Sequence, residues 1–325
     1  DQRETELTKY AKLWLKPYPG TEADLIGGLI RSIIDQSLED KNYIDKFCNN
    51  YSEFRKSVWK FDLQKISTLT GVSTQDINQA VKILTKGPMA TIYSNETIKE
   101  NNIDSLVESL VNLSLMTGNI GNESGGLFPL YRGSNSQGAV DLGVTTVNSP
   151  GNNMYKNDNR DLSFDKLIDL IKNNQIEVLH LIGDFYESYN DKLFEAIDLV
   201  SDSIKVISHQ SLISEFRNRS TSFVFPSTSF SESEGTKTNI ERRIQLVRPG
   251  MRPTDEQIQP WKIIQMFAKK MNKDIFSYNN SEKIFDDIVN NVSIYNKFSY
   301  KLLNSETNVT WPYNPNNPNN KDVIK

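Results

Sequence analysis

Residues 176–208, IEVLHLIGDFYESYNDKLFEAIDLVSDSIKVIS, indicate the fold class of this chain. Two apolar runs, at 176–183 and 204–208, have the length of buried strands, and the segment 190–200 between them has apolar residues at helical spacing. A third apolar run, SFVFP, follows at 222–226. Strands that alternate with helices form parallel sheets with crossover helices, so the sequence predicts an α/β lobe here.

The rest of the chain extends this pattern in both directions. Further helices are expected at 22–38, 41–48, 51–60, 71–87, 103–117, 163–173, 211–218, 257–271 and 281–291, and one more strand at 89–94. We therefore predict Rossmann-like lobes whose parallel sheets are flanked by helices. Residues 1–160 form a first α/β lobe with a helical insert and a glycine-rich cofactor loop, and 161–300 form a second Rossmann-like lobe. An extended, partly disordered tail follows over 301–325, which contains NPNNPNN.

The composition limits the classes of protein to which the chain can belong. Of its 325 residues 37% are hydrophobic and 24% are charged, which is ordinary for a globular protein with a sizeable core. The net charge of −4 argues against a nucleic-acid partner. Apolar runs far shorter than the roughly 20 residues that span a bilayer argue against membrane insertion. The single cysteine, Cys48, excludes an internal disulfide and a four-cysteine iron–sulfur or zinc site in this chain, and it fits a reducing compartment.

A glycine-dense segment, LMTGNIGNESGGLFPLYRGSNSQGAVDLGV (115–144), has no long apolar run and no clean period. Its glycines include Gly118, Gly121, Gly125, Gly126, Gly133 and Gly138. Glycine permits a positive φ and a close approach of the backbone to a ligand. Arg132 offers a planar fork of donors that suits phosphate or carboxylate, and Asn135 and Gln137 add donors and acceptors. The segment is either a cradle for an anionic cofactor or a long structural loop with a surface arginine.

A second polar cluster, STSFSESEGTKTNIERRIQLVRPG (227–250), follows a predicted strand. Its candidate ligand-binding residues are Glu234, Gly235, Thr236, Thr238, Asn239, Glu241, Arg242 and Arg243. Small hydroxyls, an amide and paired arginines after a strand suit a nucleotide or phosphate. The alternative is a solvated turn with a run of charges.

The other candidates have simpler interpretations. The segments DQR (1–3) and PYPGT (17–21) are in isolation a chain end and a turn. His180 lies inside an apolar strand and is expected in the core, whereas His209 follows a strand end and is a candidate general acid or base. The sequence contains no convincing Ser-His-Asp order, Walker loop or GxGxxG motif.

Taken together, several segments resemble one family. NLSLMTGNIGNESGGLFPLYRGSNSQGAVDLGV, SEGTKTNIERRIQLVRPGMRP, DQRETELTKYAKLWLKPYPGTEADL and ETNVTWP resemble, in order and rough spacing, the molybdopterin-dependent oxidoreductases of the formate dehydrogenase type. The resemblance covers residues 1 to about 313. It implies α/β lobes around a bis-molybdopterin guanine dinucleotide, with an iron–sulfur domain upstream and a β-barrel downstream. The chain is therefore expected to be an internal fragment of a large subunit.

The resemblance also assigns roles to residues of this chain. Arg132 matches the substrate-pocket arginine of formate dehydrogenases, which makes it the expected catalytic residue if the pterin site functions. The expected cofactor-binding residues are Asp1, Arg3, Gly20, Thr21, Gly118, Gly121, Gly133, Asn135, Gln137, Gly138, Glu234, Gly235, Thr236 and Asn239. Of these, Asp1, Arg3, Gly20 and Thr21 match positions near one guanine nucleotide. No metal ligand is expected in this chain, and iron–sulfur clusters are expected only in the region upstream of it.

Some segments depart from the family pattern. RGSNSQG is one residue shorter than the family's RGQNNVQG, MATIYSNETIKENN has neither glycine nor histidine after its strand, and LIGDFYESYND replaces GENPLLSDP. A phosphate loop without glycine usually cannot approach its ligand. In these departures the sequence resembles the large iron–sulfur subunit of respiratory NADH:quinone oxidoreductase (complex I), in many members of which the pterin site has degenerated.

The first hypothesis is therefore a large subunit of the complex I type, which passes electrons from NADH toward quinone and in which the pterin pocket is partly or wholly lost. Its implied partners are an NADH-oxidising flavoprotein and iron–sulfur subunits, in the cytoplasm or at the inner face of the plasma membrane. The first alternative is the alpha subunit of a molybdenum or tungsten formate dehydrogenase, in which Arg132 holds formate. The second alternative is a stand-alone nucleotide-binding module.

Overall fold

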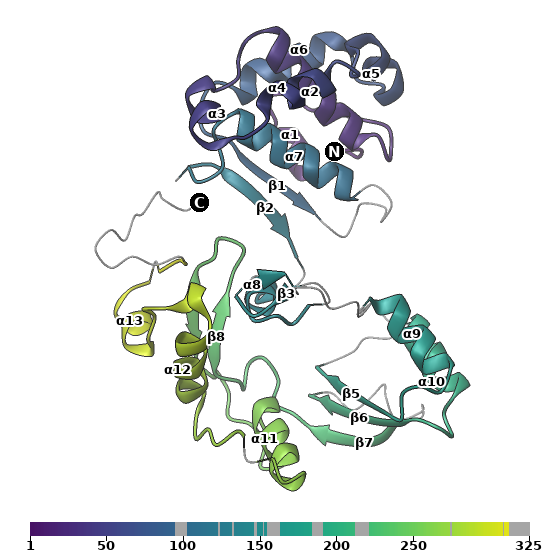
Figure 1. Ribbon diagram of the computed structural model, residues 1–325, viewed down its shortest axis with the longest axis vertical. Coiled ribbons are helices and arrows are strands. Elements are labelled where there is room, and N and C mark those ends of the chain that lie inside the picture. The colour runs from purple at the N-terminus through teal and green to yellow at the C-terminus, as the bar shows by residue number, and fades with distance from the viewer. Residues whose placement is uncertain are drawn as a thin grey trace. The chain divides into compact units, whose positions relative to one another are not determined.

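The computed structural model describes residues 1–94, 103–122, 124–131, 133–145, 148–151, 153–154, 163–183, 191–211, 221–273, 275–307 and 309–311 (Figure 1). The chain forms two compact units, an N-terminal unit that comprises Asp1–Gly133 and a C-terminal unit of Ser134–Pro315. A lobe boundary was expected near residue 160. Residues 155–162 lie outside the described part, so a division at that point stays a prediction.

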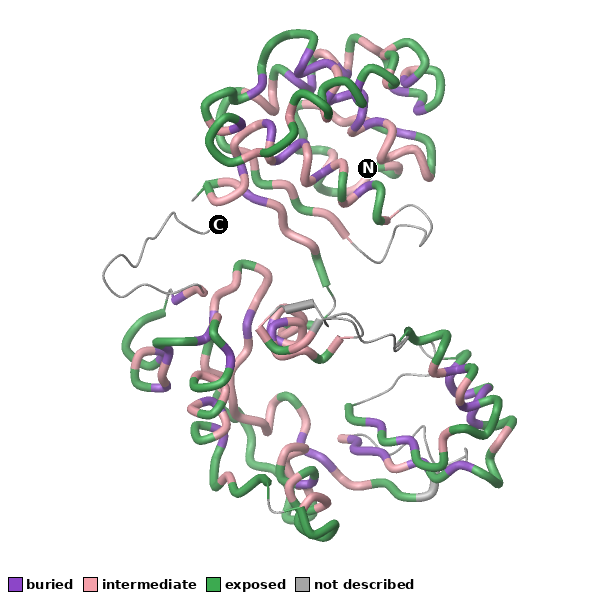
Figure 2. The backbone as a smooth tube through the Cα atoms, viewed as in Figure 1, coloured by how far each residue is buried: buried purple, intermediate pink, exposed green. Residues whose placement is uncertain are grey.

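The N-terminal unit is mainly a helical bundle around one central helix. Its helices are α1 (Glu6–Tyr10), α2 (Glu22–Asp35), α3 (Lys41–Phe47), α4 (Tyr51–Val58), α5 (Leu63–Thr70), α6 (Thr74–Leu84) and α7 (Ile103–Met116). Helix α2 packs against α4, α5, α6 and α7, and its residues Leu29, Ile30, Ile33 and Ile34 lie in the shared core. Buried residues gather where these helices face one another (Figure 2).

Helix α6 lies within the helix that the sequence predicted over 71–87, whereas the short helix α5 was not predicted. Gly71 adopts a left-handed conformation (φ 75°) that ends α5. Asp62 caps α5 by accepting a hydrogen bond from the Lys65 backbone N–H, and Ser73 caps α6 by accepting one from the Asp76 N–H. Each cap satisfies a backbone donor that the first helical turn leaves free, so two separate helices form.

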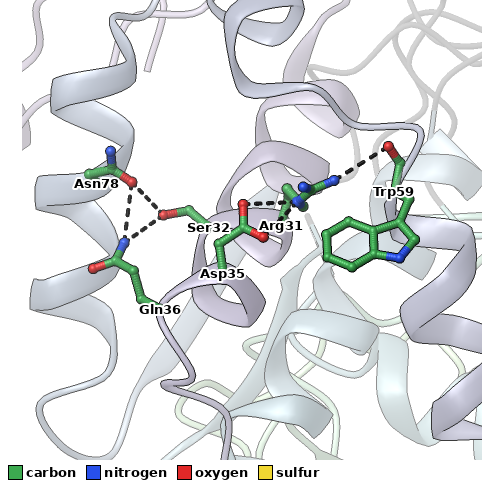
Figure 3. Close-up of polar contacts among 6 residues, drawn as sticks. All are labelled: Arg31, Ser32, Asp35, Gln36, Trp59 and Asn78. Carbon is green, nitrogen blue, oxygen red and sulfur yellow. Dashed lines mark hydrogen bonds and ion pairs between the residues drawn. The ribbon is translucent and has the colours of Figure 1, made fainter.

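Polar contacts add to the apolar packing around α2 (Figure 3). The fully buried Ser32 donates its Oγ hydrogen to Asn78 Oδ1 of α6 at 2.7 Å. Gln36 Nε2 in turn donates to Ser32 Oγ at 2.8 Å. On the neighbouring side, the Arg31 guanidinium stacks over the Trp59 ring, with its Cζ 3.8 Å from the ring centroid, and pairs with Asp35. These contacts hold α2 to α6 and to the end of α4.

A two-stranded parallel sheet completes the N-terminal unit. Strand β1 (Ala90–Ser94) pairs with β2 (Gly126–Leu130) in register from Ala90 with Gly126 to Ser94 with Leu130. The glycine-dense segment 115–144 is therefore not one long loop, because it contains β2 and the short helix α8 (Ser136–Asp141). The run GLFPL was not predicted as a strand, because its glycine and proline weaken the local strand signal. Only its pairing with β1, more than thirty residues earlier in the chain, makes it one.

The C-terminal unit contains the predicted α/β motif. Strands β5 (Val178–Ile182), β6 (Lys205–Gln210) and β7 (Thr221–Pro226) form a parallel sheet in that order. Helices α9 (Phe164–Lys172) and α10 (Asp191–Leu199) pack with β5 and β6 in one apolar core. The expected α/β class, with parallel strands flanked by helices, is confirmed. The helix expected at 211–218 falls almost entirely on residues 212–220, outside the described part.

The other face of this sheet carries aromatic rings. His180, His209 and Phe225 come from the three strands, and Phe267 comes from α11 (Pro260–Lys270). The Phe267 ring lies with its centroid 5.5 Å from that of His180 and 5.3 Å from that of Phe225. Because side chains alternate between the faces of a strand, this face is separate from the core under α9 and α10.

A third core is formed by strand β9 (Ile244–Val247), which pairs with β8 (Gly235–Thr238), together with α12 (Ser281–Asn291), the 3₁₀ turn η4 (Ser293–Tyr295) and α13 (Tyr300–Ser305). A short antiparallel pair, β3 (Asn148–Ser149) with β4 (Asn153–Met154), follows α8. An extended tail was expected from residue 301. The structure instead forms α13 there, and Leu303 of this helix is buried in the third core. Residues 312–325 lie outside the described part. Among the described helices, none combines the length and the apolar character needed to cross a membrane.

Candidate functional site

Two of the predicted clusters meet in the C-terminal unit. The Asn135 side-chain Oδ1, at the start of α8, accepts a hydrogen bond from the Thr238 backbone N–H of β8 at 2.8 Å. Lys237 Nζ, on the same strand, donates to Ser134 Oγ at 3.0 Å. These partners lie 103 positions apart in the sequence. The structure thus joins the end of the glycine-dense segment to the polar cluster of residues 227–250.

Helix α8 uses its predicted ligand-binding residues for internal contacts as well. A Cβ atom on Gly138 would collide with Asn135 Oδ1, so glycine is needed there for close packing. Gln137 Nε2 donates to Asp141 Oδ1 at 2.8 Å. Within the described residues, Asn135 Nδ2 has no hydrogen-bond partner and remains a donor that a ligand could use. Arg132 lies outside the described residues, and its catalytic assignment stays a prediction.

The hairpin β8–β9 presents the other half of this region. Gly235 has φ 151° and nothing within 4 Å of the position that a Cβ would take, so its side of the strand is open among the described residues. Thr236, the next residue, pairs with Leu246 in the hairpin. Glu234 Oε1 accepts a hydrogen bond from Ser281 Oγ of α12 at 3.0 Å, which is an anchoring contact. Asn239 Oδ1 accepts from the backbone N–H groups of two following residues and shapes the turn.

Gly118 has a structural explanation of its own, and Gly121 follows it in the same connection. The Gly118 N–H donates to Leu115 O and the Asn119 N–H donates to Ser114 O, and Gly118 adopts φ 68°. This is the arrangement that closes a helix, here α7. Both glycines lie between α7 and β2, at the amino end of the strand, whereas open α/β sheets bind ligands at the carboxyl ends of their strands. Their assignment to a cofactor stays a prediction that this geometry does not favour.

The four N-terminal candidates form a turn and a tied chain end in the N-terminal unit. The Asp1 amino group donates to Leu15 O at 3.2 Å, and Asp1 Oδ1 accepts from the Arg3 backbone N–H at 3.1 Å. Gly20 adopts φ 87°, and Thr21 Oγ1 donates to Tyr18 O at 2.7 Å. Their expected position near a guanine nucleotide stays a prediction.

A polar cluster lies at the carboxyl end of β6, and of its residues only His209 was singled out from the sequence. Ser208, His209 and Gln210 are at most 2% exposed. The Ser208 Oγ, the His209 Nδ1 and both amide atoms of Gln210 are buried and have no hydrogen-bond partner among the described residues. Each buried polar group left without a partner costs about 1–3 kcal/mol, so a polar ligand at this end of the strand would relieve the cost. The available signal was a polar SHQ triplet at the end of an apolar strand.

The two histidines form a pair rather than independent sites. His180 Nε2 and His209 Nε2 lie 2.8 Å apart, so one nitrogen donates and the other accepts. Burial lowers the pKa of both rings, and the proximity of His180 lowers that of His209 further. The expectation of a core position for His180 was wrong, because this residue lies on the more exposed face of its strand. His209 is fully buried and hydrogen-bonded to His180, and its role as a general acid or base stays a prediction.

Comparisons with known proteins identify the family. Residues 1–270 match the family model of molybdopterin oxidoreductase, and the chain belongs to that family, as its sequence motifs predicted. It is 29% identical over 329 residues to the F420-dependent formate dehydrogenase subunit alpha of Methanocaldococcus jannaschii, covering 96% of this chain and 48% of the relative. It is also 29% identical over 336 residues to the assimilatory nitrate reductase catalytic subunit of Bacillus subtilis, covering 96% of this chain and 47% of the relative.

A solved structure supports the fold. Acetylene hydratase from Pelobacter acetylenicus superimposes with a TM-score of 0.72 and 16% sequence identity, covering 96% of this chain and 47% of that one. The chain thus spans about half the length of these relatives and of this structure, and 34% of a putative formate dehydrogenase of Staphylococcus haemolyticus. The relatives are oxidoreductases by name, and some are named alpha subunits.

The family implies a molybdenum or tungsten pterin cofactor, and the described residues fit a polar group of that kind. Among them, Ser208 and Gln210 leave buried donors and acceptors unpaired at the carboxyl end of β6. Gly235 leaves open space beside its backbone. Within the same described part, Asn135 keeps a free amide donor. All four residues belong to the C-terminal unit.

Proposed function

We propose that the whole protein is the catalytic alpha subunit of a molybdenum- or tungsten-dependent formate dehydrogenase, which oxidises formate to CO₂. The observation that carries this proposal is the meeting of α8 with β8–β9 in a unit whose strand β6 ends in buried polar atoms without partners among the described residues. The names of several similar proteins support formate as the substrate. Nitrate reduction is the related activity that one of the similar proteins suggests.

Different residues of this chain would bind the cofactor and the substrate. The cofactor, when bound, supplies the two-electron redox chemistry. Gln210 and Ser208 offer both donors and acceptors, which suit the edge of a purine, so we propose the guanine dinucleotide form. Gly235 would admit the cofactor close to the backbone of β8. Arg132 would hold the formate carboxylate through its planar fork of donors. Iron–sulfur clusters would lie in other parts of the protein, since this chain has one cysteine.

The test is the cofactor content and activity of the full-length subunit purified from its native host. Stoichiometric molybdenum or tungsten, guanine nucleotide released on acid hydrolysis, and formate-dependent reduction of a viologen dye are the expected results. If the protein binds metal and pterin but reduces nitrate instead of oxidising formate, formate is excluded as the substrate. The assignment to the molybdopterin-dependent oxidoreductases then stands. Iron without molybdenum, tungsten or pterin would contradict the proposal.

A large iron–sulfur subunit of the complex I type is the second candidate, because Asn135 and Gln137 already serve internal contacts. Their hydrogen bonds to Thr238 and Asp141 indicate that the shortened loop holds itself together without a ligand. In that case the loop would be an inherited scaffold, and partners would include an NADH-oxidising flavoprotein. Co-purification with such a flavoprotein, in a state free of molybdenum, tungsten and pterin, is the outcome that would favour it.

A further inference from the structure

Asp141, the last residue of α8, is a fully buried acid at the centre of a hydrogen-bond network. Its Oδ2 accepts hydrogen bonds from the Trp311 indole Nε1–H at 2.8 Å and from the Tyr295 hydroxyl at 3.1 Å. Its Oδ1 accepts from Gln137 Nε2 at 2.8 Å. The indole and the amide nitrogen can only donate, so both carboxylate oxygens act as acceptors, as an ionised carboxylate requires.

The network joins segments that are distant in the sequence. Trp311 and Tyr295 lie 170 and 154 positions beyond Asp141. The Tyr295 hydroxyl also contacts Thr238 Oγ1 of β8 at 2.9 Å, in the strand whose backbone N–H binds Asn135. The Asp141 backbone carbonyl accepts from the Gly151 N–H at 2.7 Å. One carboxylate therefore ties α8 to β8, to η4 and to the segment after α13.

A buried charge needs this many partners. Removing a carboxylate from water is costly unless donors replace the lost hydration, and three donors do so here. Arg242 stacks over the Trp311 ring with its Cζ 5.2 Å from the centroid, and it is near enough for Asp141 to oppose the lowering of its pKa by burial. Burial also raises the pKa of Tyr295, which keeps its hydroxyl protonated. The network is thus charged, satisfied and sensitive to the loss of the one carboxylate.

We propose that Asp141 is a positioning residue, whose carboxylate fixes α8 against β8 and so holds the segment from Ser134 to Gly138 in the conformation that binds ligand. The inference rests on the proposed function. It deepens that function by naming a residue that acts through Asn135 and Gln137 rather than by touching the ligand. A merely structural residue would change the stability of the protein and leave the affinity for substrate unaltered.

The test compares Asp141→Asn with Asp202→Asn in the full-length enzyme. The first variant replaces an acceptor oxygen by an amide that must face a donor, whereas Asp202 is exposed in the turn before β6. For Asp141→Asn we expect kcat/KM for formate to fall roughly tenfold or more, mainly through KM, at unchanged metal content, because small displacements of a binding segment are costly. Asp202→Asn is expected to match the wild type.

Amide hydrogen exchange supplies a readout that does not need activity. Residues 136–141 are expected to exchange faster in Asp141→Asn than in Asp202→Asn, and Asp141→Glu is expected to restore part of the protection. If Asp141→Asn does not fold, Tyr295→Phe removes one donor and is expected to raise KM by a smaller factor. Loss of stability with unchanged KM and unchanged exchange in α8 would overturn the positioning role. If the wild type does not oxidise formate but residues 136–141 still exchange faster in Asp141→Asn, formate is excluded as the substrate. The role of Asp141 in fixing α8 then stands.

Discussion

At the scale of single residues, buried polar atoms without partners point to the site. Gln210 is 2% exposed and neither of its amide atoms has a hydrogen-bond partner among the described residues. A residue that serves only the fold would not carry such a cost, since an apolar side chain of the same shape would be more stable there. Gln210 is therefore a direct test of whether the carboxyl end of β6 binds a ligand.

We expect Gln210→Leu to stabilise the cofactor-free protein by about 1–3 kcal/mol and to lower its cofactor content, because the variant removes the unpaired amide. Gln265 supplies a matched control, since its Oε1 accepts from the Tyr278 N–H at 2.8 Å. Gln265→Leu should instead destabilise by about 1 kcal/mol. Urea unfolding measures both. A destabilised Gln210→Leu protein that keeps its cofactor would contradict the assignment.

The histidine pair predicts a pH dependence of stability. Both pKa values are lowered in the folded state, so the unfolded chain binds protons first as the pH falls below about 6.5. The contribution of the pair to the free energy of unfolding should therefore be fully present above that pH and decrease toward the lowered folded values. His209→Phe removes one titrating ring next to Phe225 and Phe267 and should flatten the dependence between about pH 7.5 and 5.5. The sequence has two histidines, so an equal slope in this variant would show that the pair is not its source.

At the scale of elements, the short connections decide which glycines serve the fold. Gly118 closes α7 in a left-handed conformation, and a Cβ there would approach Asp40 Oδ2 to 2.7 Å. Gly138 packs on Asn135 at the start of α8. Glycine density in the sequence indicated backbone freedom, yet it did not distinguish a helix end from a ligand cradle. The distinction depends on what each glycine packs against in the folded unit.

Gly118→Ala is expected to lower the free energy of unfolding by about 1–2 kcal/mol, because a left-handed conformation is strained for any side chain. Its cofactor content should equal that of the wild type. Gly87→Ala is the control, since nothing described lies within 4 Å of the Cβ position of Gly87 and no left-handed φ is required. Thermal unfolding and metal analysis of both variants test this. A cofactor-deficient Gly118→Ala protein of normal stability would support the cofactor role that the sequence predicted for Gly118.

At the scale of the whole molecule, the chain is two compact units with separate cores. Ile33 lies in the core around α2 and Ile171 in the core under α9 and α10, and both are fully buried. We expect Ile33→Ala and Ile171→Ala each to cost about 2–5 kcal/mol in the free energy of unfolding. Because the two cores share no residue, the double variant should show the sum within about 0.5 kcal/mol. Denaturant unfolding monitored by circular dichroism is the measurement, and a coupling energy well above about 0.5 kcal/mol would contradict the independence of the two cores.

The sequence by itself determined the family, the α/β class and most of the long helices. Apolar spacing over 22–38, 103–117 and 176–208 reports local periodicity, which needs no knowledge of the partner surface. The motifs determined the family because each joins several residue types in a fixed order. Periodicity and motifs both depend on residues that lie close together in the sequence.

Only the tertiary structure decided how the candidate residues are used. Strand β2 exists because it pairs with β1, and α13 because its apolar residues reach a core. The meeting of Asn135 with Thr238, the pairing of the histidines and the contact of Asp141 with Trp311 join residues from 29 to 170 positions apart. No local pattern encodes such contacts. They arise because burial of apolar surface brings distant segments together, and the polar groups carried with them must then find partners or remain unpaired.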